Sequence, residues 1–137
     1  MNLTYANNIS NEKVIVDSKQ IVFDNPLIEK KYILFFPITS LKKELNYKIN
    51  NNKKINGYDL SFEHFKVSLS KNSRELWINN NPYFFTQPTF KYKNELYLPF
   101  NEFINYTGFK YEKIDSKNII KKEKIPIYNK KNIKLLA

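Results

Sequence analysis

Residues 95–108 are ELYLPFNEFINYTG, and this stretch combines a strand, a proline step, a short helix and a glycine. Residues 95–98 favour a strand, and Pro99 lies where proline is tolerated, at or just before the first helical turn. Gly108 readily takes the left-handed conformation that closes a helix. The apolar positions between them follow the i, i+3, i+4 spacing of one helix stripe, and they are Phe100, Phe103 and Ile104. The stretch therefore predicts a strand that leads into a helix ending at Gly108.

The same pattern occurs earlier in the chain, at a constant offset that brings Pro37 onto Pro99. Asn46, which also readily closes a helix, then aligns with Gly108. The apolar stripe of this first copy is Ile38, Leu41 and Leu45. Within residues 14–49, the identical pairs at this offset are Phe23/Phe85, Pro26/Pro88, Lys31/Lys93, Leu34/Leu96, Pro37/Pro99 and Lys48/Lys110. The sequence therefore predicts two copies of one structural unit.

A hairpin is predicted upstream of each helix. Residues 14–23 place turn-forming residues 17–19 between two β-rich runs, and residues 75–85 place residues 79–82 between two others. Residues 65–70 alternate apolar and polar side chains, as a half-buried strand does. The apolar stripe of each helix must be buried, and the sheet is the only large apolar surface available. We expect an α+β fold of two related units of antiparallel strands, each with one short α-helix packed on the sheet.

This pattern predicts the domain organisation. Residues 1–12 are polar, without strand or helix period, and are expected to be a flexible leader. Residues 13–122 form the folded domain, with unit one over 13–64 and unit two over 65–122. Residues 123–137 are expected to be a basic tail or linker. No basic segment followed by an apolar one identifies a signal peptide in this chain, and no apolar stretch has the roughly 18 residues of a membrane span.

The composition excludes several kinds of chemistry. The 137 residues contain no Cys, one His and two Gly. Without Cys the chain has no thiolate nucleophile and no Cys-based zinc site, and with two Gly it has no glycine-rich phosphate loop. We expect no enzyme activity, no cofactor, and no catalytic, metal or cofactor-binding residue. The single His64, between Glu63 and Phe65, is expected to be a surface or capping residue.

The basic charge has two interpretations. The chain carries 23 Lys and Arg against 13 Asp and Glu, a net charge of +10, and Arg74 is its only arginine. Many Lys, Asn and Ile indicate an AT-rich genome, whereas a selected anionic partner would favour Arg for bidentate contacts. The candidates for an anionic partner are Lys121, Lys122, Lys124, Lys130, Lys131 and Lys134.

Aromatic residues give a second set of candidates. Aromatic side chains on a sheet can stack on sugars or bases, and they also pack between units. The candidates for stacking are Trp77, Tyr83, Tyr92 and Tyr97.

The chain resembles the copper amine oxidase N-terminal domain-like, or stalk, family. The residues that carry the resemblance are 67–82, Pro88, 96–100 and 103–108. That family has a strand, a hairpin, a proline, an apolar-Pro-apolar step into a short helix and a Gly stop, and the resemblance covers about residues 13–122. One departure is that Thr39 and Asn101 stand where the family usually has Arg after the apolar-Pro-apolar step.

The resemblance implies a non-catalytic accessory module. Copper amine oxidation uses three His and a Tyr within an Asn-Tyr-Asp/Glu motif, and neither residues 46–48 nor residues 105–107 contain the acid. We therefore expect a spacer or docking domain of an exported bacterial protein, outside the cytoplasm or at the cell surface. Its partner would be a protein or a cell-wall component, and sheet edges offer a route to oligomers. The alternative is a binding module for an anionic polymer of the cell wall, with nucleic acid a less favoured partner.

Overall fold

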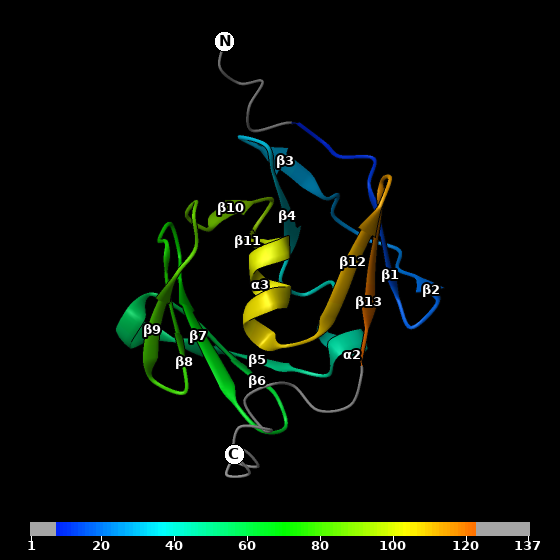
Figure 1. The fold of residues 1–137 in the computed structure, drawn as a ribbon. Helices are drawn as coiled ribbons and strands as arrows, with labels where there is room; N and C mark the ends of the chain where they lie inside the picture. The colour runs from blue at the N-terminus through cyan, green and yellow to red at the C-terminus, as the bar shows by residue number, and fades with distance from the viewer. Residues whose placement is uncertain (1–7, 123–137) are drawn as a thin grey trace. The chain divides into compact units, whose positions relative to one another are not determined.

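The computed structural model describes residues 8–122 (Figure 1). Strands account for 49% of the described residues and helices for 13%, so the fold is mainly β rather than evenly α+β. The chain divides into two compact units. Within the described residues, unit 1 consists of residues 8–36 and 100–122, and unit 2 consists of Pro37–Pro99.

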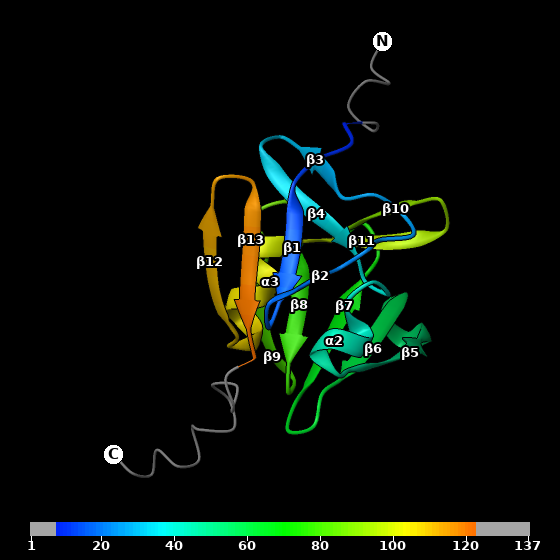
Figure 2. The ribbon, with the colours of Figure 1, turned by 90° about the vertical axis from the view of Figure 1, so that its right-hand side faces the viewer.

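Unit 1 contains a four-stranded sheet in the order β12-β13-β1-β2. The hairpins β12–β13 and β1–β2 are antiparallel, and β1 runs parallel to β13, as the arrows of Figure 2 show. A further hairpin, β3–β4, precedes the passage into unit 2. The elements of unit 1 are β1 (Lys13–Val16), β2 (Lys19–Gln20), β3 (Ile28–Lys30), β4 (Ile33–Pro37, whose last residue opens unit 2), α3 (Phe100–Thr107), β12 (Lys110–Ile114) and β13 (Lys117–Lys121).

The core of unit 1 forms around the apolar stripe of α3. The rings of Phe100 and Phe103 lie 5.6 and 5.3 Å from the ring of Phe36 on β4, and Phe100 also contacts Tyr111 on β12 at 5.6 Å. Phe36, Phe100 and Phe103 have no exposed surface. Burial of a Phe side chain stabilises the folded state by about 2 kcal/mol, so this aromatic cluster is a main source of stability in unit 1.

Unit 2 contains a five-stranded antiparallel sheet in the order β5-β6-β7-β8-β9. Its elements are α2 (Lys42–Leu45), β5 (Lys48–Asn52), the 3₁₀ helix η1 (Lys53–Ile55), β6 (Gly57–Ser61), β7 (Lys66–Ser70), β8 (Glu75–Ile78), β9 (Asn81–Phe84), β10 (Phe90–Tyr92) and β11 (Glu95–Pro99). Side chains alternate along each strand, so one face of the sheet is apolar and buried. The fully buried side chains of that face are Leu60, Val67, Leu69, Leu76 and Ile78.

The two predicted helices differ in length. Helix α3 extends from Phe100 to Thr107 and is followed by Gly108 at φ 85°, as the sequence predicts. Helix α2 is a single turn that ends at Asn46 in the left-handed conformation, φ 60°. Its start is displaced to Lys42 because the Ser40 hydroxyl donates to the Pro37 carbonyl at 2.7 Å and forms a local turn. Ser is prone to such bonds, which compete with the helix ladder.

The strand bounds repeat at the offset that relates Pro37 to Pro99. Strands β1, β3, β4 and β5 moved along the chain by this offset give the bounds of β8, β10, β11 and β12. The compact units differ from the expected sequence copies, 13–64 and 65–122, because the chain passes between units at Phe36–Pro37 and Pro99–Phe100. Each compact unit therefore combines one half of each expected copy. That the two copies are related in structure stays a prediction of the sequence.

Hairpin turns are shorter than predicted. The turn after β8 consists of Asn79 and Asn80 alone, both at positive φ, and Pro82 lies within the edge strand β9. Proline is tolerated at an edge because one side of the strand forms no ladder bonds. Two-residue turns with both residues left-handed match the twist of hairpin strands. The same geometry places Tyr32, 96% exposed, at the tip of the β3–β4 hairpin with φ 67°.

Residues 8–12, at the end of the expected leader, make defined contacts in unit 1. Ile9 forms an isolated antiparallel bridge with Ile28, and Ser10 N–H donates to the Leu27 carbonyl at 2.9 Å. These contacts attach the segment to β3. Residues 123–137, the expected tail, lie outside the described residues.

Candidate binding surfaces

The five-stranded sheet of unit 2 has a second face, opposite its core, which we call the polar face. One row of directly opposed residues crosses all five strands of this face, and it consists of Asn50, Asp59, Ser68, Trp77 and Pro82. Asn50 and Pro82 are exposed, Asp59 and Trp77 are half-buried, and Ser68 is buried. The row therefore combines small polar side chains, one carboxyl group and one large aromatic ring.

Asp59 is the centre of a hydrogen-bond cluster on the polar face. Its Oδ1 accepts from Ser68 Oγ at 2.7 Å and from Asn52 Nδ2 at 3.0 Å. Its Oδ2 lies 3.9 Å from Lys66 Nζ. Burial alone would raise the pKa of Asp59, but the bonds from Asn52 and Ser68 and the charge of Lys66 outweigh it and lower the pKa. Asp59 is therefore a carboxylate at neutral pH.

The predicted stacking residues do not share one surface. Trp77 is opposite Pro82 on the polar face, whereas the next residue along β8, Leu76, is opposite Tyr83, so Tyr83 lies on the other face. Tyr97 on β11 has no exposed surface, and burial raises its pKa. Tyr92 packs edge-on against Tyr97 at 5.7 Å. Trp77 is thus the stacking candidate on the polar face, and Tyr97 is a packing residue.

Of the lysines predicted to bind an anionic partner, two lie within the described residues and four lie outside them. Lys121, on β13, is directly opposite Lys110 on β12, and both side chains are exposed. Lys122 instead pairs with Asp17, through its backbone N–H at 3.0 Å and through its Nζ at 4.0 Å. Lys124, Lys130, Lys131 and Lys134 lie outside the described residues.

Each unit has a surface cavity at the start of the hairpin that follows its helix. The cavity of unit 1 has a volume of about 330 Å³ and is lined by Lys110, Tyr111, Glu112, Ile119 and Lys121. The cavity of unit 2 has a volume of about 340 Å³ and is lined by Asn46, Lys48, Ser61, Phe62 and Glu63. Lys48 aligns with Lys110 in the sequence repeat, so the two cavities have the same place in the pattern but different charges.

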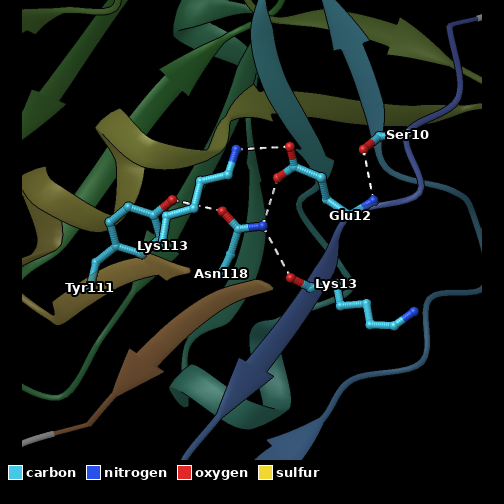
Figure 3. Close-up of polar contacts among 6 residues, drawn as sticks. All are labelled: Ser10, Glu12, Lys13, Tyr111, Lys113 and Asn118. Carbon is cyan, nitrogen blue, oxygen red and sulfur yellow. Dashed lines mark hydrogen bonds and ion pairs between the residues drawn. The ribbon is translucent and has the colours of Figure 1, made fainter. Parts of the chain in front are cut away.

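A polar cluster in unit 1 is satisfied by its own members (Figure 3). The Asn118 amide, 1% exposed, donates to Glu12 Oε1 at 2.8 Å and to the Lys13 carbonyl at 3.0 Å. Its oxygen accepts from the Tyr111 hydroxyl at 2.7 Å, and Lys113 pairs with Glu12 at 2.8 Å. Burial, and then the charge of Glu12, raises the pKa of Tyr111 to about 12. Because these groups bond to one another, the cluster joins β13 to β1 and is structural.

His64 and Thr39, two residues noted in the sequence, both lie in unit 2. His64 lies 3.6 Å from its neighbour Glu63, and both side chains are exposed, as expected of a surface residue. Thr39, which stands where the resembled family usually has Arg, donates from its hydroxyl to Glu95 Oε2 at 2.6 Å. A short polar contact therefore occupies this position.

Pairing across strands, rather than residue type, creates the Asp59 cluster. The alternation in residues 65–70 indicates that Ser68 points away from the core. The partners of Ser68 depend on the register of β6 and β8 against β7, which residue spacing alone does not give. The sequence reasoning therefore missed Asp59.

Comparison with known proteins identifies the family. A model of the copper amine oxidase N-terminal domain matches residues 15–121. The chain belongs to this family. No curated protein and no solved structure matches the chain. In copper amine oxidases this N-terminal domain is non-catalytic.

Two kinds of feature are missing from the described part of the chain. Among residues 8–122, no group of three His, Cys, Asp or Glu side chains lies close enough to hold a metal ion. Over the same residues, no helix has the length and apolar character needed to cross a membrane.

Proposed function

We propose that this chain is a non-catalytic docking module of an exported bacterial protein, which attaches its parent protein to a partner outside the cytoplasm. The observation that supports this most directly is the match of residues 15–121 to a non-catalytic domain family. The short hairpins and the buried aromatic core of unit 1 suit a rigid scaffold, because packed interiors transmit load with little deformation.

The arrangement of polar groups agrees with docking rather than catalysis. The Asn118 and Asp59 clusters are made of side chains that bond mainly to one another. A general acid or base needs a free path to a reacting group, whereas the titratable groups of the Asn118 cluster, Glu12 and Tyr111, are bonded within it. The polar face and the two cavities lie at the surface, where a partner can bind without reacting.

A second candidate function is electrostatic binding of an anionic polymer. Lys110 and Lys121 face each other across neighbouring strands beside the cavity of unit 1. Like charges directly opposite destabilise a pair of strands, and a bound phosphate or carboxylate would relieve the repulsion. This arrangement favours an anion at that place.

Retention on purified bacterial cell wall and on an anionic matrix, at about 50 and 200 mM salt, tests both candidates. The docking function predicts retention on the wall that changes little with salt. Electrostatic binding predicts retention on both supports that falls by orders of magnitude over this range. Absence of retention on the wall at both salt concentrations would reject docking to the wall.

A variant separates the two candidates further. Lys121→Gln removes the repulsion with Lys110 and is expected to abolish any salt-sensitive retention. Lys48→Gln, in the corresponding cavity of unit 2, is the matched control, because Lys48 is opposite Ser61 and not opposite another cation. If Lys121→Gln and Lys48→Gln reduce retention equally, the anion is held by overall charge and not by the Lys110–Lys121 pair.

A further inference from the structure

We propose that the polar face of unit 2 binds a saccharide, with a sugar ring stacked on Trp77 and a sugar hydroxyl group bonded to Asp59. The inference rests on the proposed docking function and names the chemical class of its partner. A saccharide has C–H surfaces that suit an aromatic ring and hydroxyl edges that suit polar side chains. The polar face offers both kinds of group in one row.

Trp77 supplies the aromatic surface. Its side chain is half-buried on the polar face, and its indole has no hydrogen bond or ring contact among those of the described residues. No buried polar side-chain atom in this part of the chain lacks a partner, so the indole N–H reaches solvent. A buried Trp usually finds an acceptor for this N–H, and aromatic rings with one wet end are typical of binding surfaces.

Asp59 supplies a charged acceptor. Its Oδ1 is occupied by Ser68 and Asn52, whereas its Oδ2 has only the cation of Lys66, at 3.9 Å, beyond hydrogen-bond distance. The Asp59 side chain is 21% exposed, and Oδ2 is the carboxylate oxygen left to accept from a ligand hydroxyl. Hydrogen bonds from hydroxyl groups to a carboxylate are shorter and stronger than those to a neutral oxygen. The bonds to Oδ1 fix the carboxylate before a ligand arrives.

The spacing suits an extended chain of sugar rings. Asp59, Ser68 and Trp77 lie in register on β6, β7 and β8. Neighbouring strands are about 4.8 Å apart, so the row from Trp77 to Asp59 extends over about 10 Å. A chain with one ring on Trp77 can pass over the small Ser68 side chain and reach Asp59. Trp77 and Asp59 are therefore both within reach of one oligosaccharide.

The charge of the row favours a saccharide over a nucleic acid. Single-stranded nucleic acids bind where a positively charged groove follows the backbone beside aromatic rings. The Asp59 carboxylate lies in the same row as Trp77 and would repel a phosphate backbone. A neutral saccharide meets no such repulsion and gains an acceptor.

Intrinsic fluorescence provides a direct test, because Trp77 is the only tryptophan in the chain. The full chain would be titrated with cellohexaose, chitohexaose, xylohexaose and the oligonucleotide poly(dT), with excitation where only tryptophan absorbs. We expect a saturable change in emission with at least one oligosaccharide, and little loss of affinity between about 50 and 200 mM salt. No saturable change with any of the three oligosaccharides would overturn the proposal, as would binding of poly(dT) alone.

Variants measured by calorimetry connect binding to the two residues. Trp77→Ala is expected to abolish binding, Trp77→Tyr to retain it with lower affinity, and Asp59→Asn to weaken it about tenfold, the loss of one charge-assisted hydrogen bond. The matched controls are Tyr32→Ala, an exposed aromatic residue of unit 1, and Asp24→Asn, an exposed carboxylate. Both controls should bind as the unchanged chain does.

The outcomes separate this proposal from the docking function. If the chain is retained on cell wall and Trp77→Tyr and Asp59→Asn bind unchanged, the saccharide site is wrong and docking stands. If Trp77→Ala alone loses binding while its thermal unfolding shows loss of the fold, Trp77→Tyr decides, because it keeps an aromatic ring in the sheet. If retention and oligosaccharide binding are both absent, both proposals fail.

Discussion

In unit 2, β7 lies between β6 and β8 and is antiparallel to both, whereas in unit 1, β13 pairs directly with β1 in parallel. The hairpins concerned have matching places, since β5 aligns with β12 in the sequence repeat, and β1 aligns with β8. An antiparallel strand between two others leaves them parallel to each other. The matching hairpins are therefore joined through β7 in unit 2 and directly, by the β13–β1 pair, in unit 1.

The two junctions between hairpins, through β7 in unit 2 and directly between β13 and β1 in unit 1, depend on different contacts. Where β7 is present, its backbone lies close to Gly57 on β6, and the sheet needs a residue without Cβ there. Where no strand intervenes, the Asn118 cluster joins β13 to the segment that leads into β1. One junction therefore depends on close backbone approach and the other on a buried amide. Substitutions and a change of pH can test this difference.

The largest effect is expected at the junction with β7. An added Cβ at Gly57 would lie 1.7 Å from the Leu69 carbonyl oxygen and 2.7 Å from its carbon, both backbone atoms that cannot move without separating the strands. Gly57→Ala should lower the free energy of unfolding by about 4 kcal/mol, at the upper end for single substitutions. Urea denaturation measures this change. A loss of less than about 1 kcal/mol would mean that β6 and β7 separate at little cost.

A slightly smaller effect is expected at the junction without β7. Asn118→Ala leaves Glu12 and the Tyr111 hydroxyl without one of their partners in a largely buried place. We expect a loss of about 3 kcal/mol in the free energy of unfolding. Asn51→Ala, an exposed residue on β5, is the control and should change it by less than about 0.5 kcal/mol. Equal effects of the two variants would show that the Asn118 cluster does not hold the sheet.

The helix ends give a third comparison, between Asn46 at φ 60° and Gly108 at φ 85°. Left-handed conformations cost a residue with Cβ about 1–2 kcal/mol. Gly108→Ala should therefore destabilise unit 1 by this amount, and Asn46→Gly should stabilise unit 2 by a few tenths of a kcal/mol, since Asn tolerates the conformation better than most residues. Thermal unfolding of the two variants checks the opposite signs. The same sign for both would contradict the cap assignment.

The smallest effect is a pH dependence of unit 2. The pKa of Asp59 is lowered in the folded state from its ordinary value of 3.8. Its carboxylate therefore contributes stability above pH 3.8, and this contribution is lost as the pH falls through the folded-state pKa. Asp59→Asn should reduce the loss of stability below about pH 4 seen in urea denaturation. An unchanged acid profile would show that the Asn52 and Ser68 bonds do not favour the charged form.

Local features of the fold, including the hairpins β1–β2 and β8–β9, were predictable from the sequence, and pairings between distant strands were not. Pro99, the stripe of Phe100 and Phe103, and Gly108 define α3 because each acts within one or two turns of helix. The length of α2 was overestimated, since the apolar spacing that indicates a helix does not include the Ser40 bond to the Pro37 carbonyl. The overestimated helix also explains why the expected fold class was α+β rather than mainly β.

The candidate surfaces were predictable only in part. Trp77 was found as a single residue, because an aromatic in a strand is visible in the sequence. Its neighbours in the row, Asp59 and Ser68, depend on the register of three strands, which long-range packing fixes. Lys121 was found by charge, while its pairing with Lys110 follows from the two-residue turn between β12 and β13. Single candidate residues can thus be recognised in the sequence, whereas which of them lie side by side depends on the strand topology.

The discontinuity of unit 1 has a consequence for synthesis. Unit 2 is one continuous segment, Pro37–Pro99, and the strands of its five-stranded sheet, β5 to β9, each pair with a neighbour in the chain. Strand β1 emerges from the ribosome first but cannot find its parallel partner β13 until about one hundred further residues have been translated. At about 5–20 residues per second, nascent β1 waits at least about 5 s with an unpaired edge. During this interval, chaperones have access to Val14–Val16, and slower translation lengthens the wait.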